Sequence, residues 1–472
     1  MSTAAIAAAL AVAISPADSL MWQVPGQAFE NPAVRQWMLP HSSSSVGLTA
    51  RDDHRNGEAV AMMGTGESAW GVDARSFIKA GLSTVWGTAQ YDNGRQTGRI
   101  TCETSEPEMV YPYFTVDTVG GPLRMEHYAF SGGYATTAGT DSRLAWGVSG
   151  GYRAGLYYRA TDPRPRNTTG LLNITAGIGY RLFGDYYGAV SARYSKYKQS
   201  NDIDFKSQMG VEKIYHYTGL GHHYVRFAGV GYDNDYSGHE WQGQLTLYPS
   251  AGRGFSASAA LSRYSVTKIL TELNKLPLAK AVQWRFRGQA AWVGRVIGVS
   301  FDADVWRRRG YENIFGDASS GIYPHIGRYH RFSHCGYVFR AGALAELHPR
   351  TATLLNLGAT AGLTRNEFCY MTPPETRRAD AALVQALARI TMPFAGRWRL
   401  GLGATYQGYL AFDKLDIDNI YGRNVQRLGA DALLSMALNA KLTLRLAAMY
   451  AHTDYGAGVR GNSMACSLAV VF

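Results

Sequence analysis

The sequence predicts an all-β fold, a transmembrane antiparallel up-and-down barrel of about 18 strands, with 14 or 16 strands as the alternatives. Three observations predict it. Apolar residues alternate with small or polar ones over stretches of about 10 to 16 residues, which is a period of two. Very short connections alternate with long polar ones. Beyond the first 20 positions no apolar run reaches the roughly 18 residues that a membrane-spanning helix needs.

The chain begins with a segment that is expected to direct export. Residues 4–14 form an apolar run that is too short to span a bilayer, and Ser15-Pro16-Ala17 suits a signal-peptidase cut before Asp18. We therefore expect a signal peptide at 1–17, a periplasmic N-terminal segment at 18–41 and the barrel at 42–472. An apolar helix buried in the fold is the alternative for the first segment, because it contains no Lys or Arg ahead of the apolar run.

The strands are justified by their alternating faces. Apolar residues share one phase in three segments: Leu172, Ile174, Ile178 and Tyr180; Ile297, Val299, Phe301 and Val305; Met464, Cys466, Leu468, Val470 and Phe472. The patterns place the centres of the first three strands near positions 48, 64 and 83. Aromatic residues at strand ends fit the two interfacial girdles of a membrane barrel, or else ordinary packing: Trp146, Tyr180, Trp241, Trp398, Tyr450 and Phe472.

The connections fall into two classes. Short turns are expected near 183–185, 249–252, 294–295, 348–350, 394–397 and 439–441. Long loops are expected near 92–122, 160–167, 199–236, 268–279, 307–332, 365–379 and 412–424. Short turns on one side and long loops on the other are typical of outer-membrane barrels, with the turns in the periplasm and both termini on the same side.

Composition excludes several other classes. The 472 residues include 53 Gly, 30 Tyr and 46% hydrophobic residues, which is incompatible with a disordered chain. The net charge is +11, but the basic residues are scattered and do not form one arm or helix, so we expect no nucleic-acid partner. Four cysteines without a C-x-x-C spacing indicate no zinc or redox motif.

Several segments carry a family resemblance. They are Tyr111-Pro112-Tyr113, 117–121, 162–167, 217–221, 307–310, 312–318 and the terminal Phe472 with apolar residues at every second position before it. Over most of the mature chain these segments resemble an uncharacterised family of Bacteroidota outer-membrane barrels. The resemblance implies a location in the outer membrane and a genetic neighbourhood of TonB-dependent uptake receptors and surface lipoproteins. It implies no substrate and no catalytic residue.

Charged residues on the small-residue phase are expected to face the lumen, because a charge at the lipid midplane costs several kcal/mol. The expected set is Arg153, Arg181, Arg193, Asp302, Asp304, Arg399, Arg427, Asp431 and Arg445. Two interpretations remain open for them: ion pairs that brace the wall or hold an inserted plug, and a basic pore that favours anions.

Two groups of residues could carry chemistry. Histidines expected in exterior loops could capture a metal or haem, but their spacing matches no ligand motif: His216, His222, His223, His325, His330 and His334. We expect no cofactor. Ser265, His239 and Glu240 could serve a barrel enzyme that acts on lipid or peptide, but they share no motif.

The cysteines lead to one expectation about oxidation. Cys335 and Cys369 are expected near the exterior ends of neighbouring strands, where a disulfide could form. Cys466 is expected to face lipid and stay reduced, and Cys102 lies in a loop with no evident partner.

The sequence therefore indicates an outer-membrane barrel with outer-membrane lipid and lipopolysaccharide as its surroundings. It would act as a solute channel, or as a membrane component of a surface nutrient-uptake assembly beside a TonB-dependent receptor or lipoprotein. The barrel enzyme is the alternative.

Overall fold

The structure, a computed structural model, describes residues 23–39, 41–57, 64–99, 104, 106–117, 119–139, 143–207, 214–319, 321–350, 353–412, 424–439 and 442–472. The expected signal peptide at 1–17 and Cys102 lie outside these residues. Within them, no helix has the length and apolar character required to cross a bilayer.

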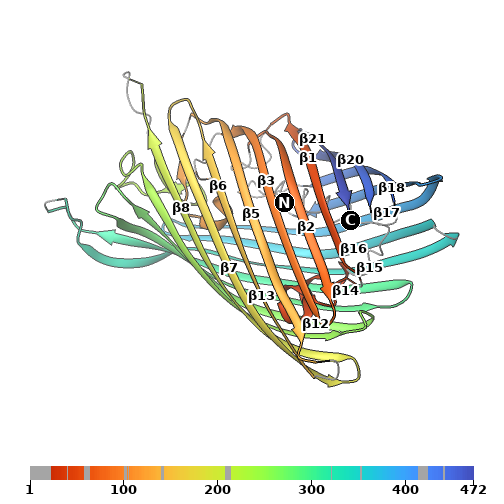
Figure 1. Cartoon of the computed structure of the whole chain (residues 1–472). Helices are drawn as coiled ribbons and strands as arrows, with labels where there is room; N and C mark the ends of the chain where they lie inside the picture. The colour runs from red at the N-terminus through yellow and green to blue at the C-terminus, as the bar shows by residue number, and fades with distance from the viewer. Residues whose placement is uncertain are drawn as a thin grey trace.

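Eighteen strands form one antiparallel sheet that closes on itself (Figure 1). The first half comprises β1 (Ser43–Arg55), β2 (Gly66–Ala80), β3 (Ser83–Arg99), β5 (Gly121–Thr137), β6 (Leu144–Tyr158), β7 (Arg164–Phe183), β8 (Tyr186–Asp204), β11 (Asn234–Pro249) and β12 (Gly254–Leu270). The second half comprises β13 (Leu276–Val293), β14 (Ile297–Phe315), β15 (His325–Arg350), β16 (Thr353–Met371), β17 (Pro374–Ala395), β18 (Trp398–Ala411), β19 (Val425–Ala437), β20 (Thr443–Asp454) and β21 (Arg460–Val471). Each strand pairs with the next along the barrel, and β21 pairs with β1 to close it. The predicted closed barrel of 18 antiparallel strands is confirmed.

The two ends of the barrel differ as the connections predict. At one end, here called the turn end, the connections are short, such as Gly184-Asp185 and Gly396-Arg397. Gly184 and Gly396 have φ of +47° and +53°, and this left-handed backbone suits glycine. At the other end, the loop end, the two longest connections span 100–120 and 205–233. The first strand begins and the last strand ends at the turn end.

Several connections at the loop end are shorter than expected. The segments 307–332 and 365–379 were expected to be loops, but β14, β15, β16 and β17 continue through most of both. The strands continue because inter-strand pairing satisfies the backbone N–H and carbonyl groups, whether the side chains are polar or apolar. His325, His330 and His334 therefore stand on strand β15 and not in a loop.

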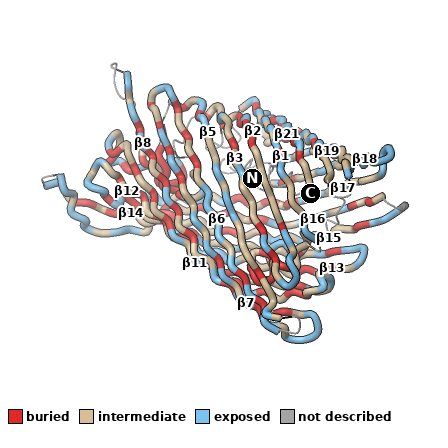
Figure 2. The backbone as a smooth tube through the Cα atoms, viewed as in Figure 1, coloured by how far each residue is buried: buried red, intermediate tan, exposed pale blue. Residues whose placement is uncertain are grey.

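The two faces of each strand are distinct. On β7, Ile174 is 55% exposed on the outside, whereas its neighbour Thr175 is buried on the inside. The outer phase of the barrel is mostly apolar in its middle, and it includes every aromatic residue expected in the girdles. Buried positions concentrate on the side formed by β7 to β14 (Figure 2).

The lumen receives three additional segments. They are the N-terminal η2 (Gly26–Glu30) and α2 (Pro32–Arg35), the short helix α3 (Pro107–Val110), and a small sheet of β4 (Thr115–Val116), β9 (Tyr215–Gly219) and β10 (His222–His223). The segment 18–41 was expected to lie outside the barrel, in the periplasm. Its described part packs inside, because it carries apolar residues that bury against the wall.

Candidate functional site

The lumen is the candidate site, and at the turn end it is occupied by the protein's own N-terminal segment, residues 26–38. Two inward glycines of neighbouring strands make room for it. A Cβ atom at Gly147 would lie 2.7 Å from the backbone of Pro32, and one at Gly177 would overlap the side chain of Asn31. The Asn31 Oδ1 accepts a hydrogen bond from the Ala33 N–H at 3.0 Å, which caps α2. The wall and the segment are thus complementary in shape.

Aromatic contacts hold the N-terminal segment against β8 and β11. Phe29 packs edge-on against Tyr248 with ring centroids 5.1 Å apart, and Trp37 packs against Tyr187 at 4.5 Å. Both tyrosines are buried on the inner face of the barrel, near the turn end. Each aromatic pair of this kind contributes about 0.5–1.5 kcal/mol of stability beyond the contribution from its buried apolar area.

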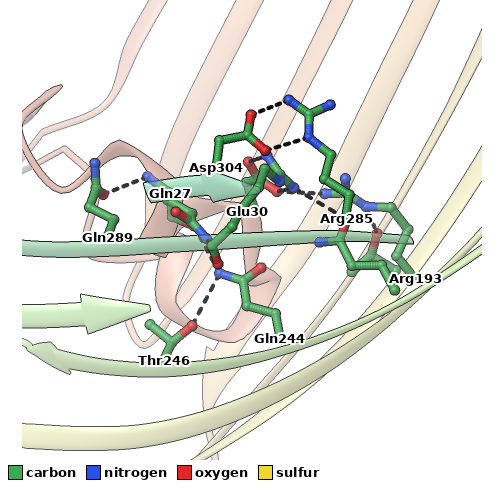
Figure 3. Close-up of polar contacts among 11 residues, drawn as sticks. Gln27, Glu30, Arg193, Gln244, Thr246, Arg285, Gln289 and Asp304 are labelled. Atoms are coloured by element: carbon green, nitrogen blue, oxygen red, sulfur yellow. Dashed lines mark hydrogen bonds and ion pairs between the residues drawn. The ribbon is translucent and has the colours of Figure 1, made fainter. Parts of the chain in front are cut away.

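A polar clamp holds the same segment to β8, β11 and β13 (Figure 3). Both Glu30 carboxylate oxygens accept from Arg287, at 2.8 and 2.7 Å, and Arg193 lies 3.6 Å away. The backbone N–H of Gln27 donates to Gln289 Oε1 at 3.0 Å, and Gln244 Nε2 donates to the Gln27 carbonyl at 2.9 Å. The bidentate geometry makes Glu30 the strongest single polar anchor of the segment.

At the loop end, the described parts of connections 100–120 and 205–233 fold inward over the same side of the wall. Their buried apolar residues form one cluster with the barrel: Val110, Tyr111, Tyr113, Phe114, Leu220, Tyr224 and Phe227 against Tyr197, Tyr236, Tyr264, Leu270, Leu278, Phe315, Phe332 and Phe368. Arg308 donates to the backbone carbonyls of Glu108 and Met109, at 3.1 and 2.8 Å, which satisfies the end of α3.

Two ion pairs tie connection 100–120 to the barrel. Arg159 and Asp117 meet at 2.7 Å, with both side chains almost completely buried. Arg153 meets Glu106 at 2.8 Å. Burial raises the pKa of Glu106, and the nearby Arg153 opposes that shift. Removing one partner of such a buried pair is costly, because the other charge remains in the interior.

On the opposite wall, β17 contacts the small sheet near the loop end, where His222 and Glu375 meet at 3.0 Å. Among the described residues, the buried clusters formed by the inner segments include no residue of β18, β19 or β20. The inner phase of β17 to β20 holds five arginines and two carboxylates: Arg377, Arg389, Arg399, Arg427 and Arg445, and Glu375 and Asp431. Asp431 pairs with Arg389 at 2.7 Å. Arginines therefore outnumber carboxylates on this part of the wall.

The residues expected to face the lumen can now be placed individually. Arg153, Arg193 and Asp431 form the ion pairs described above. Asp304 pairs with Arg285, and Asp302 accepts from Gln289 at 2.7 Å. Arg181, Arg399, Arg427 and Arg445 stand on the same strand phase as these residues.

The sequence reasoning missed five ion-pair partners: Glu30, Glu106, Arg285, Arg287 and Arg389. The strand phase could have identified the three arginines, because they alternate with outward apolar residues such as Phe286. No pattern in the sequence identified Glu30 as an ion-pair partner.

The histidines do not form a metal site. Within the described ranges, no group of three or more His, Cys, Asp or Glu side chains is arranged to hold a metal ion. His216 is fully buried, and its Nε2 lies 3.0 Å from the Val230 carbonyl. The other histidines have separate contacts: His222 with Glu375, His223 with Tyr215, His325 with Asn313, His330 with Tyr311 and His334 with Asn366.

The three residues weighed for catalysis do not form a triad. His239 and Ser265 are direct partners in the β11–β12 ladder and face outward. Glu240 follows His239 on the same strand, so its side chain points to the opposite face. The ring nitrogens of His239 instead contact Tyr194 and Lys196, both at 2.8 Å.

Comparisons with solved structures find similarities at low sequence identity. It is similar to the ferric-catecholate import receptor Fiu from E. coli K12, with 10% identity, a TM-score of 0.43 and coverage of 91% of this chain and 81% of that chain. It is similar to BauA, the ferric preacinetobactin receptor from Acinetobacter baumannii, with 9% identity, a TM-score of 0.45 and coverage of 92% and 80%. It is also similar to the CymD monoaromatic hydrocarbon channel, with 9% identity, a TM-score of 0.34 and coverage of 94% and 92%.

No curated protein matches the chain. A family match extends from residue 32 to residue 468, from α2 to the last strand of the barrel. The chain therefore belongs to the family of unknown function DUF6850.

Proposed function

We propose that this protein is an outer-membrane barrel that conducts small anionic solutes through a lumen closed at rest by its own N-terminal segment and loops. The location is supported by the outward apolar phase, which is long enough to cross a bilayer and is bordered by aromatic side chains. A barrel of 16 to 18 strands is wide enough for an aqueous channel.

The observation that carries the proposal is the way in which the N-terminal segment is held. Residues 26–38 are attached to the wall by ion pairs, hydrogen bonds and aromatic contacts. Such contacts can be broken and remade without unfolding the barrel. The arginine-rich wall of β17–β20 would then favour anions through electrostatic attraction.

Planar-bilayer recording tests this function. The full-length protein should show rare openings, and a variant lacking residues 23–39 should show steady current. The reversal potential in a salt gradient should indicate anion preference in both. The absence of current from the truncated variant, with the barrel still folded, would contradict a channel.

The filled lumen also favours a second candidate, a membrane component of a surface uptake assembly. The side formed by β7 to β14 is packed at both ends by the protein's own segments, which suits a scaffold as well as a gate. Co-purification of a TonB-dependent receptor or a surface lipoprotein from native membranes, together with a silent truncated variant, would support this role. Hydrolysis of phospholipid, lipopolysaccharide or peptide that is lost on His239→Ala would instead support the enzyme alternative.

A further inference from the structure

Six basic side chains form a band on the outer surface of the barrel. They are Lys196, Lys198, Arg263, Lys280, Arg307 and Arg309, on β8, β12, β13 and β14, and we call them the basic band. Ladder partners place them on the outward phase, with Arg263 paired to the outward Trp241 on one side and to Trp284 on the other. The band lies between the apolar part of the outer surface and the loop end.

The register shows how close together these cations lie. Trp284 pairs with Arg307 in the next ladder, so Arg263 and Arg307 flank the same indole. One row towards the loop end, Lys196 pairs with His239. From β8 to β14 the band crosses four inter-strand spacings of about 4.8 Å, or roughly 19 Å.

The band lacks compensating carboxylates. On β8 and β11 the first outward carboxylates are Asp202 and Asp235, close to the loop end, and the outward phases of β12, β13 and β14 contain none. No ion pair involves any of the six cations among the described residues. The neighbouring strands β16 and β17 differ, because Arg365 and Arg378 both pair there with Asp380. The six cations of the band therefore lack carboxylate partners throughout the described sector from β8 to β14.

Apolar side chains lie directly below the band. Leu245, Leu261 and Phe286 continue the outer phase towards the turn end, and Leu245 is 62% exposed. Trp241, at 63% exposed, lies at the border in the same row as Arg263. A ligand that fits this surface needs acyl chains below and at least one anionic group above.

We propose that the basic band binds the phosphate groups of a phosphorylated glycolipid in the outer leaflet, with its acyl chains on the apolar surface below. Guanidinium groups match phosphate oxygens in a bidentate geometry, and ammonium groups add point charges. Tryptophan side chains at the border suit the headgroup level. This inference rests on the proposed location in the outer membrane.

The test uses the full-length protein in a neutral detergent, titrated with lipid A that carries two phosphates and followed by native mass spectrometry. The lipid should bind, and the double variant R263Q/R307Q should bind at least about tenfold more weakly. Lipid A without phosphates should bind wild type as weakly as the variant does. Inorganic phosphate should not displace the bound lipid.

The matched control is R95Q/R124Q. These two arginines are likewise outward and exposed, and they are ladder partners on β3 and β5, whereas Trp284 separates Arg263 from Arg307. Equal loss in both double variants, equal binding of the phosphate-free lipid, or displacement by inorganic phosphate would overturn the inference. Membrane fractionation separates this result from the proposed location: a barrel in the outer-membrane fraction that binds no lipid A would refute only the basic band.

Discussion

The carboxylate of Asp431 on β19 lies 2.7 Å from the guanidinium of Arg389 on β17, although a complete strand separates the two residues. The position between them on β18 is Gly403, the ladder partner of both. A Cβ atom at Gly403 would overlap the Asp431 carboxylate. The missing side chain therefore lets an ion pair cross the intervening strand.

Replacing this glycine should break the pair. In Gly403→Ala the added methyl group displaces Asp431 from Arg389, and we expect the free energy of unfolding to fall by about 1–2 kcal/mol. Urea unfolding in lipid vesicles, followed by tryptophan fluorescence, measures this change. Gly243→Ala is the control, because nothing lies within 4 Å of its added atom. A stability equal to wild type in Gly403→Ala would contradict the role of this glycine.

The same arrangement occurs a second time in the wall. Arg51 on β1 meets Asp92 on β3 at 2.8 Å, and Gly71 on β2 lies between them as the ladder partner of Asp92. A Cβ at Gly71 would overlap the Asp92 carboxylate. Both ion pairs lie on the inner face, and each crosses an intervening strand at a glycine. Inward glycines of this wall therefore make room for ion pairs, in addition to the glycines that form its turns.

The architecture could be predicted from the sequence because strand phase is a local property. The alternation on β7, β14 and β21 and the side of each short turn follow from neighbouring residues alone. The second and third strands were placed too early, at centres near 64 and 83, whereas β2 and β3 span Gly66–Ala80 and Ser83–Arg99. Their outer phase is less regular, with Ser68 and Ser76 on β2 and Asn93 on β3, so the period of two is weak there.

The contents of the lumen could not be predicted in the same way. Glu30 and Arg287 are 257 positions apart in the chain, and no periodicity links them. The strand phase identifies a charge that faces inward, but its partner depends on which segment enters the barrel. The packing of residues 26–38 on Gly147 and Gly177 is likewise visible only in three dimensions.

Neutralising the clamp should loosen the N-terminal segment. Glu30→Gln keeps the shape of the side chain but removes the charge that Arg287 and Arg193 share. If the closed state loses about 1 kcal/mol relative to the open state, the open fraction in planar bilayers should rise roughly fivefold. The two freed guanidinium groups should also increase anion preference.

The control for this variant is Glu126→Gln. Glu126 lies on the outward phase of β5, and Tyr128 donates a hydrogen bond to it at 3.3 Å. The Glu126→Gln variant should leave conductance unchanged. If Glu30→Gln and Glu126→Gln gave the same open fraction as wild type, the clamp would have no part in closing the lumen.

The expected disulfide between Cys335 and Cys369 is not formed, and both thiols are free. In the β15–β16 ladder Cys335 pairs with Glu367, and Cys369 pairs with Ser333. The cysteines are thus diagonal neighbours, whose side chains start about 7 Å apart, whereas a disulfide needs Cβ atoms about 3.8 Å apart. Alkylation of the folded protein without reductant, followed by mass mapping, should label both. A Cys335–Cys369 linked peptide would show that the register shifts.

The folding of connection 205–233 should depend on pH through His216. Burial lowers the pKa of His216 well below its usual value of 6.5, and the nearby Lys268 lowers it further. The unfolded segment therefore binds a proton more readily than the folded one, so the packing of this connection should weaken as the pH falls below about 6.5. After correction for the slower intrinsic exchange at low pH, amides in peptides spanning 214–230 should have smaller protection factors at pH 5 than at pH 7.5. His216→Gln retains a donor for the Val230 carbonyl and should remove most of this difference, whereas His223→Gln, at an exposed position of the same small sheet, should preserve it. Equal protection factors at both pH values in wild type would mean that the buried imidazole does not govern this segment.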